Sequence, residues 1–443
     1  MPIARHRSVT ILVIMVLGSH VAGADPPPMI RLAGTPEQMG TIWGQLNREH
    51  IRHDLEIGYL KRAAAAGISE QMLMERSATA LRIIEQIAPH WLEEARATAR
   101  AAEVPEDIYL AFLDGVVRDR FLHECTSYAV SREHARDGTI LFHKTRDNRD
   151  VPQSVYIADS AVEGVNKFIA VSNATGIRCS MMVNDKGLAG AADYPAERKK
   201  DSSQLELEPA DLQYRGIMAG TILRYIAERA SDCAEALAII EDFVAKGYYA
   251  GGKVGGSHWL FVDRHGVILE VCNNAGHVVS QVHDQNVYFS RLNNSSAAQR
   301  LRDADDLVDF GLFRSVSRDS SICFGSSISG MTVEIDPDAP EWFTCAWITL
   351  PVRAAAFPLL MGQSHTPRSL LDGSAYQWGK ASPKQVARWE ALEQSMHRDK
   401  QQLKAEVAAS IEAGNPDAAH VEILEAWSQA QADKLVHALQ HPE

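Results

Sequence analysis

The hydrophobic pattern of this chain changes from helical to strand-like spacing at residue 125. Before that point, Thr35 is suited to the N-cap of a helix, and Gln38 completes a capping box. Apolar residues recur at helical spacing over 69–102, and a shorter helix is predicted after Pro105. We therefore expect residues 25–124 to form a helical segment without obvious chemistry of its own.

From Cys125 onwards the pattern alternates between strands and helices. Residues Cys125–Val130 and Ile140–Lys144 are predicted strands, joined by a polar turn that contains Asp137-Gly138. Further strands are predicted at 155–157, 167–171, 179–184, from 188, 258–262, 267–272, 287–289, 331–335 and 342–348, and helices at 214–229, 232–243 and 296–308. From 383 to the end, the sequence predicts a charged helical hairpin broken at Gly414-Asn415-Pro416, which suits packing or oligomerisation better than catalysis. The fold class is therefore α+β.

The first 24 residues have the features of a secretory signal peptide. Arg5 and Arg7 give a basic start, Val9–Leu17 is a short apolar run, and Ala22-Gly23-Ala24 offers a cleavage site of small residues. A membrane anchor is the alternative, although the apolar run is shorter than the ~20 residues that cross a bilayer. No later stretch is long and apolar enough to span one. We expect a periplasmic or secreted protein.

Composition and cysteine spacing exclude several functions. The chain has 443 residues, 46% of them hydrophobic, and a net charge of −13 without basic clusters, which argues against nucleic acid as a partner. None of the six cysteines is spaced as in zinc or thioredoxin-like sites, so no metal or other cofactor is expected. The disulfide pattern cannot be read from the sequence, and a homo-oligomer is left open.

Cys125 is the candidate nucleophile. An isolated cysteine is more often a small core residue than a reactive one. This one, however, stands where the helical segment gives way to strands, and hydroxyl residues Thr126 and Ser127 follow it. The return strand ends in a charged cluster where a central strand would be apolar: Lys144, Arg146, Asp147 and Arg149. Reactive cysteines lie in such charged surroundings.

These residues carry a resemblance to a known family. Cys-Thr-Ser-Tyr at 125–128, Asp-Gly-Thr-Ile-Leu at 137–141 and Lys-Thr-Arg-Asp-Asn at 144–148 resemble the start of the mature chain of N-terminal-nucleophile (Ntn) hydrolases. The most similar branch is that of the acyl-coenzyme A:6-aminopenicillanic acid acyltransferases (peptidase family C45), related to choloylglycine (bile salt) hydrolases, penicillin V acylases and C69 dipeptidases. Less specific matches follow in order at 183–189, 224–240 and 261–270, so the resemblance covers about 35–360.

The resemblance implies a four-layer αββα sandwich over 125–382, with 25–124 as a helical propeptide or alpha-subunit segment and 383–443 as a helical tail. It also implies self-cleavage between Glu124 and Cys125, leaving 443 − 124 = 319 residues. The freed α-amine, with a pKa of roughly 7.7–8.0, would act as base for its own thiol. The thiolate would then take an acyl group from a linear amide as a thioester and release it to water or an amine.

Several further residues match the family's site. Asp147 matches the aspartate that holds the nucleophile, and Arg146 a basic neighbour that lowers the thiol pKa or binds a carboxylate. Asp193-Tyr194 lies near an oxyanion asparagine of the bile salt hydrolases, but an ionised aspartate cannot donate a hydrogen bond. Asn293 or Asn294 lies near a later active-site asparagine. Asn184, in the turn resembling that family's N-E-K-G-L-A turn, is assigned with Asp193 and Tyr194 to substrate binding.

Three functions remain open at this stage. The favoured one is a self-processing hydrolase or acyltransferase acting on a small-molecule amide or a peptide. A C69-like dipeptidase would share the nucleophile and the fold. A periplasmic binding protein that kept the fold without catalysis is supported by the departures at Asp193 and Glu124, where many relatives carry glycine before the nucleophile.

Overall fold

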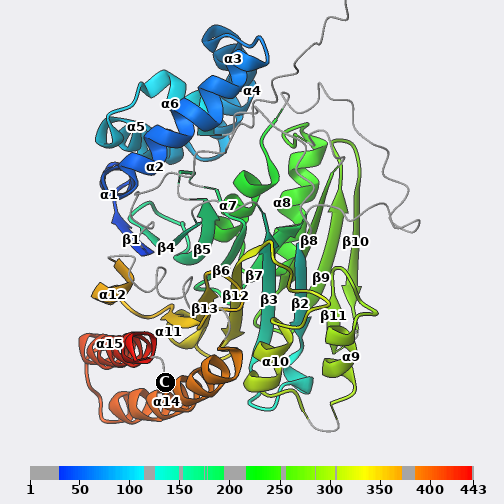
Figure 1. The fold of residues 1–443 in the computed structure, drawn as a ribbon, viewed down its shortest axis with the longest axis vertical. Coiled ribbons are helices and arrows are strands. Elements are labelled where there is room, and N and C mark those ends of the chain that lie inside the picture. The colour runs from blue at the N-terminus through cyan, green and yellow to red at the C-terminus, as the bar shows by residue number, and fades with distance from the viewer. Residues whose placement is uncertain are drawn as a thin grey trace, which may run out of the picture.

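The structure is a computed structural model that contains two β-sheets packed face to face. It describes residues 29–113, 125–148, 153–173, 175–176, 178–193, 216–250, 256–284, 286–304, 307–371 and 385–441. One sheet has eight strands in the order β1-β4-β5-β6-β7-β8-β9-β10, and the other has six in the order β11-β2-β3-β12-β13-β14 (Figure 1). The predicted signal peptide, the residue before Cys125 and Tyr194 lie outside the described residues.

Apart from the parallel pair β1–β4, neighbouring strands run antiparallel. The strands of the larger sheet are β1 (Met29–Gly34), β4 (Gln153–Ser160), β5 (Phe168–Asn173), β6 (Met181–Asn184), β7 (Ala189–Asp193), β8 (Ser257–Val262), β9 (Ile268–Asn273) and β10 (Val278–His283). Those of the smaller sheet are β2 (Thr126–Val130), β3 (Ile140–Asp147), β11 (Val287–Phe289), β12 (Ser327–Ile335), β13 (Cys345–Thr349) and β14 (Phe357–Leu360).

Helices cover the outer face of each sheet. The N-terminal ones are α1 (Pro36–Leu46), α2 (Arg48–His53), a π-helix (Asp54–Leu60), α3 (Lys61–Ala65), α4 (Glu70–Ile87), α5 (Pro89–Ala102) and α6 (Glu106–Leu113). The later ones are α7 (Ala219–Arg229), α8 (Cys233–Ala245), α9 (Ser296–Arg302), α10 (Phe310–Val316), α11 (Pro340–Phe343), α12 (Arg368–Leu371), α14 (Val386–Glu412) and α15 (Asp417–Gln440), with a 3₁₀ turn at Arg132–His134.

Side-chain alternation along the strands produces the layers. Ile140 and Phe142 of β3 and Ala189 and Ala191 of β7 belong to one apolar core between the sheets. The opposite face of the larger sheet packs against α1, α4, α5, α7 and α8, and that of the smaller sheet against α9, α10, α14 and α15. The molecule is thus an α+β protein with four αββα layers, as the sequence predicts.

The N-terminal segment begins with a strand that the sequence analysis did not anticipate. Met29–Gly34 pairs in parallel with β4 at the edge of the larger sheet. Its six residues are too few for a clear alternation, and both faces of the strand are used. Met29 enters the core between the sheets, while Ile30 and Leu32 pack under the helices. The segment is therefore built into the sheet as well as into the helical layer.

A buried ionic cluster also fastens this segment to the rest of the molecule. The Arg224 guanidinium of α7 donates to Glu94 of α5 at 2.5 Å and to Glu228 at 2.9 Å. Trp91 of α5 donates to Glu228, and His90 is bonded to it at 2.9 Å. These groups are almost fully buried, so each needs its partners to remain inside the protein.

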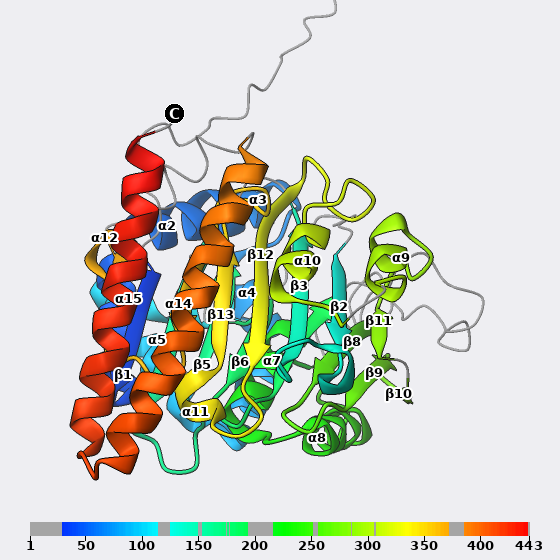
Figure 2. The same ribbon diagram turned by 90° about the horizontal axis from the view of Figure 1, so that it is seen from below.

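The C-terminal hairpin is an integral layer of the fold. Helix α14 ends at Glu412 and α15 begins at Asp417, so the predicted break falls between them. Figure 2 shows both helices lying against the smaller sheet. Leu403 and Val407 of α14 pack in one cluster with Trp347 of β13. Within this layer the Glu393 carboxylate accepts hydrogen bonds from Arg318 at 2.5 Å and 3.0 Å.

Two element boundaries differ from expectation for local reasons. The predicted strand at 342–348 begins as helix α11, because Pro340 occupies its first turn, and β13 starts at Cys345. The predicted helix at 296–308 ends at Arg302, and Val308 instead bridges Ala135. Edge strands β10 and β14 were not predicted.

In the part of the chain that the structure describes, no helix has the length and apolar character needed to cross a membrane.

We expect the buried Glu393 to make the protein sensitive to acid. Burial alone would raise its pKa, but Arg314 and Arg318 outweigh burial and hold the pKa at about 2. Its stabilising contribution is thus complete above about pH 4.5 and lost as the pH falls towards 2. Glu393→Gln should cost about 3–5 kcal/mol at neutral pH, because two arginines lose their buried counter-charge. Urea unfolding between pH 2 and 7 measures both effects.

The matched control for this prediction is Glu390→Gln. Glu390 is a half-buried neighbour that lies 3.8 Å from Arg318, and it should contribute less than about 1 kcal/mol. Equal destabilisation by the two substitutions would contradict the assigned role of Glu393.

Candidate functional site

Cys125 lies directly before β2 at one end of the space between the sheets. Ala129 of the same strand enters the inter-sheet core, so alternation places Ser127 and Cys125 on this inner face. Strand β2 itself lies against β7 and β8 of the opposite sheet. Only 5% of Cys125 is exposed to solvent. The thiol therefore lies in the interior, where its surroundings are set by the side chains of the facing strands β7 and β8.

The principal charged group beside Cys125 is a buried ion pair. Lys144, on the inner face of β3, places its ammonium 2.9 Å from Asp193 Oδ1 at the end of β7. The same ammonium donates to the Ala192 carbonyl at 2.5 Å. Lys144 comes from the smaller sheet and Asp193 from the larger one, so the pair joins the two sheets beside the thiol.

Two serines complete the coordination of Asp193. Ser127 donates to Asp193 Oδ1 at 3.1 Å, and Ser290 donates to Oδ2 at 2.8 Å. Ser290 Oγ also accepts the backbone N–H of Ser127 at 3.0 Å. Burial would raise the pKa of Asp193, but the charges of Lys144 and His258, together with the hydrogen bonds from Lys144 and Ser290, lower it. Asp193 is thus an ionised acceptor that positions Lys144 and both serines.

The thiol of Cys125 is neutral at rest in the uncut chain. Burial raises its pKa, and Asp193 adds to that effect. Three groups act in the opposite direction: the Lys144 charge, a hydrogen bond from the backbone N–H of Asp147, and Arg146. The site therefore contains groups that can stabilise a thiolate, but a base must first remove the proton.

Arg146 and Asp147, both predicted site residues, lie at the end of β3 beside Cys125. Arg146 reaches across to the larger sheet, where it donates to Gln153 at 2.6 Å and to Asn173 at 2.8 Å. Asp147 accepts a 2.5 Å hydrogen bond from Ser327 of β12, at the place where an irregularity in that strand shifts its register. Hydrogen bonds with residues of neighbouring strands thus hold both side chains in position.

The other predicted site residues are placed differently. Asn293 lies in the turn between β11 and α9, where its backbone and side-chain oxygens accept from Arg302. Asn184 lies at the opposite end of the β6–β7 pair from Asp193. Its amide donates to two carbonyls at the end of α7, and its oxygen accepts from the following turn. The position of Asn184 therefore gives no support to a contact with substrate.

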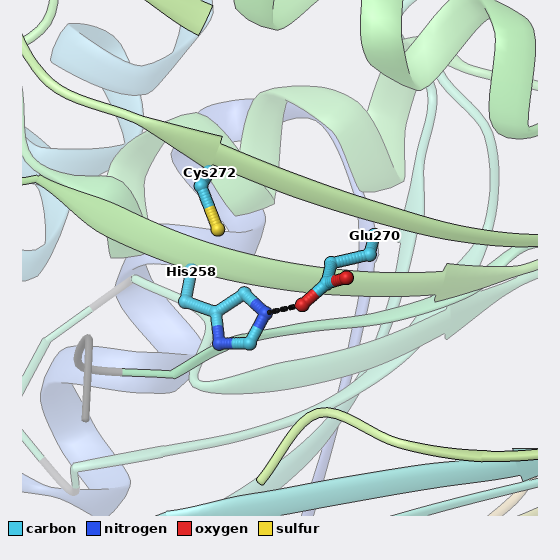
Figure 3. A group of neighbouring side chains, drawn as sticks. All are labelled: His258, Glu270 and Cys272. Carbon is cyan, nitrogen blue, oxygen red and sulfur yellow. Dashed lines mark hydrogen bonds and ion pairs between the residues drawn. The ribbon is translucent and has the colours of Figure 1, made fainter. Parts of the chain in front are cut away.

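The sequence analysis did not find a second polar cluster, on the larger sheet next to Asp193. Asp193 pairs with His258 of β8, and His258 pairs with Cys272 of β9, so these three residues form a row across adjacent strands. Glu270 is two residues from Cys272 on the same face, and its carboxylate is 2.5 Å from His258 Nε2 (Figure 3). The residues are scattered in sequence, and only the strand register brings them together.

This cluster holds opposite charges close together. Burial would lower the pKa of His258, but contacts with Cys272 and Glu270 raise it to about 10. Burial would raise the pKa of Glu270, but hydrogen bonds from His258 and His283 lower it well below its usual range. His283 is 3.1 Å from the second carboxylate oxygen of Glu270 and stacks on Tyr288.

All six cysteines of the chain lie within the described residues, and none forms a disulfide.

No protein-family model and no curated protein sequence matches this chain. Structural likeness extends, at low identity, to proteins with the Ntn-hydrolase fold. A penicillin V acylase from Agrobacterium tumefaciens shares 13% identity at a TM-score of 0.39, covering 54% of this chain and 86% of that one. An N-acylethanolamine-hydrolyzing acid amidase ortholog from Caenorhabditis elegans shares 10% at 0.36, covering 49% and 94%. A conjugated bile acid hydrolase variant from Clostridium perfringens shares 12% at 0.36, covering 54% and 93%. All three TM-scores lie below 0.5.

Lys144 and Asp193 should change the reactivity of Cys125 in opposite directions. Lys144→Gln removes the charge that favours the thiolate, and alkylation by iodoacetamide near neutral pH should slow. Asp193→Asn removes the opposing charge, and alkylation should accelerate. Each unit of change in the thiol pKa corresponds to a roughly tenfold change in the thiolate fraction. The measurement is the alkylation rate of Cys125, followed by mass spectrometry of the peptide that contains it.

Lys186→Gln, in the exposed turn after β6, is the control and should leave the rate unchanged. A loosened fold would accelerate alkylation in both test variants. Slower alkylation of Lys144→Gln is therefore the result that loosening cannot produce, and faster alkylation of this variant would contradict the prediction.

Proposed function

We propose that this protein is a self-processing cysteine hydrolase or acyltransferase that acts on linear amide bonds through a thioester on Cys125. The observation that carries the proposal is the setting of the thiol. It lies at the start of an inner strand, with a backbone N–H donor from Asp147 and the Lys144 ammonium beside it. A buried cysteine in a purely structural role would need neither group.

The proposed reaction begins at the bond between Glu124 and Cys125. The Cys125 sulfur attacks the preceding carbonyl, the acyl group moves from nitrogen to sulfur while the thiol proton passes to the nitrogen, and water hydrolyses the resulting thioester. A new α-amine is thereby produced on the residue that carries the nucleophile. In each later turnover that amine accepts the thiol proton, the sulfur forms a thioester with the substrate carbonyl, and the proton passes to the leaving amine. Water or an amine then releases the acyl group.

The surrounding residues have distinct proposed roles. Lys144 stabilises the thiolate, and Asp193 holds Lys144 in place. Asp147 positions the nucleophile, and Arg146 is a neighbouring cation able to bind a substrate carboxylate. The proposed substrate is a small-molecule amide or a peptide. The signal peptide predicted at 1–24 would direct the activity to the periplasm or outside the cell.

Two alternative functions, a binding protein and a dipeptidase, can be distinguished from the proposed one. The departures at Asp193 and Glu124 support a binding protein without catalysis, but Asp193 is paired with Lys144 beside the thiol and is compatible with catalysis. A dipeptidase would require a free amino group on its substrate. Blocking the amine of a dipeptide that is cleaved therefore separates the dipeptidase from the amidase.

The purified protein should contain two fragments, produced by cleavage between Glu124 and Cys125. Intact-mass measurement should find a chain of 319 residues beginning at Cys125, and Cys125→Ala should remain uncut. With a slowly released amide substrate, the processed enzyme should also gain the mass of one acyl group on Cys125. Cys233→Ser is the control, because its hydroxyl can keep the hydrogen bond that the Cys233 thiol gives to the Val267 carbonyl. An intact chain whose Cys125 also resists thiol-reactive probes would contradict the proposal.

The N-terminal fragment should remain bound after cleavage. Strand β1 and the cluster around Arg224 connect it to the larger fragment, so the two should co-elute in size-exclusion chromatography at neutral pH. Arg224→Met leaves Glu94 and Glu228 without their buried counter-charge, which costs about 3–5 kcal/mol, and should release the fragment at lower urea concentration. Arg229→Gln, on the exposed side of the same helix, should not. Elution of the 319-residue fragment alone would instead favour a discarded propeptide.

A further inference from the structure

The cluster on the larger sheet has the donor set of a transition-metal site. One ligand atom each from His258, Glu270 and Cys272 lies within 4.8 Å of the others. Nitrogen, oxygen and sulfur donors suit Zn²⁺, which prefers tetrahedral coordination with bonds of roughly 2.0–2.3 Å. Ligands around such an ion are roughly 3.5 Å apart, so small side-chain rotations suffice to close the site.

The backbone already fixes these three residues on one surface. His258 and Cys272 are direct partners on neighbouring antiparallel strands, and Glu270 follows on the same face of β9. Figure 3 shows the imidazole and carboxylate directed towards one another, with the sulfur above the ring. Strands give a more rigid ligand arrangement than a loop, so the metal would meet a largely prepared site.

Residues outside the three ligands orient the Glu270 carboxylate, as outer residues do at known metal sites. Glu270 uses one oxygen for His258 and is bonded through the other to His283 at 3.1 Å. The His283 ring is stacked on Tyr288, with ring centroids 3.5 Å apart. Outer contacts of this kind orient carboxylate ligands and commonly affect metal affinity 10–100-fold. In the proposed bound state, the cation replaces the proton between His258 and Glu270 and the thiol proton of Cys272, and both protons are released to solvent.

We propose that His258, Glu270 and Cys272 bind one divalent cation of the zinc class, with His283 as a positioning residue. Three protein ligands leave a fourth coordination position for water or a substrate oxygen. The ligands lie on the inner face of the larger sheet, as Asp193 does. The site is separate from Cys125 and does not depend on the proposed amide chemistry.

The test uses the full-length Cys125→Ser variant, which removes the proposed nucleophile as a competing ligand. After treatment with chelator, the protein is titrated with Co²⁺, a spectroscopic substitute for zinc. We expect one Co²⁺ per chain, visible bands of tetrahedral cobalt and a near-ultraviolet charge-transfer band from a bound thiolate. Zn²⁺ added in equal amount should displace the cobalt and remove these bands.

Substitutions in the same background identify the ligands. Cys272→Ser should abolish the charge-transfer band, and His258→Gln should weaken binding at least 100-fold. His283→Gln should weaken it roughly 10–100-fold while retaining the band. Cys233→Ser, at the start of α8 on the other face of the sheet, should change nothing. Absence of stoichiometric binding, or a charge-transfer band that survives Cys272→Ser, would overturn the assignment.

Discussion

The buried ion pair between Lys144 and Asp193 is the interaction on which the candidate site depends. Each residue comes from a different sheet, and neither has appreciable contact with solvent. Transferring two charges from water into a protein interior is costly, and only close pairing with additional hydrogen bonds offsets that cost. Ser127, Ser290 and the Ala192 carbonyl supply those bonds. The relative position of the sheets at this end is therefore tied to the electrostatics around Cys125.

The outer helical layers are also held by buried ion pairs. Each helical layer contains a buried carboxylate–guanidinium cluster: Arg224 with Glu94 and Glu228 on one side, and Arg318 with Glu393 on the other. Apolar packing alone would permit helices to slide over a sheet, whereas a buried charge tolerates little displacement from its partner. We infer that these clusters fix the position of the outer layers, and through them the strands that carry the site.

Local signals allowed the sequence to predict one half of the site. Cys125 and Asp147 are brought together by a single hairpin, because β2 pairs directly with β3. The hydroxyl residues and the charged strand end were visible in the same short stretch. By contrast, the partnership of Lys144 with Asp193 joins two sheets, and nothing local to either residue indicates it. The row from Asp193 through His258 to Cys272 likewise depends on the register of three strands.

The burial of Cys125 is the remaining point to reconcile with reactivity. A thiol whose pKa is raised by burial is a poor nucleophile, and Lys144 and Arg146 only partly counter that effect. Under the proposed mechanism, cleavage before Cys125 changes this residue itself. It places an amine with a pKa of roughly 7.7–8.0 on the same Cα atom that carries the thiol side chain, where that amine can accept the thiol proton without help from a distant base. The first attack on the Glu124 carbonyl needs a thiolate before that amine exists, and the charges of Lys144 and Arg146 and the backbone N–H of Asp147 are the groups that favour it. After cleavage the amine supplies the base for each later turnover.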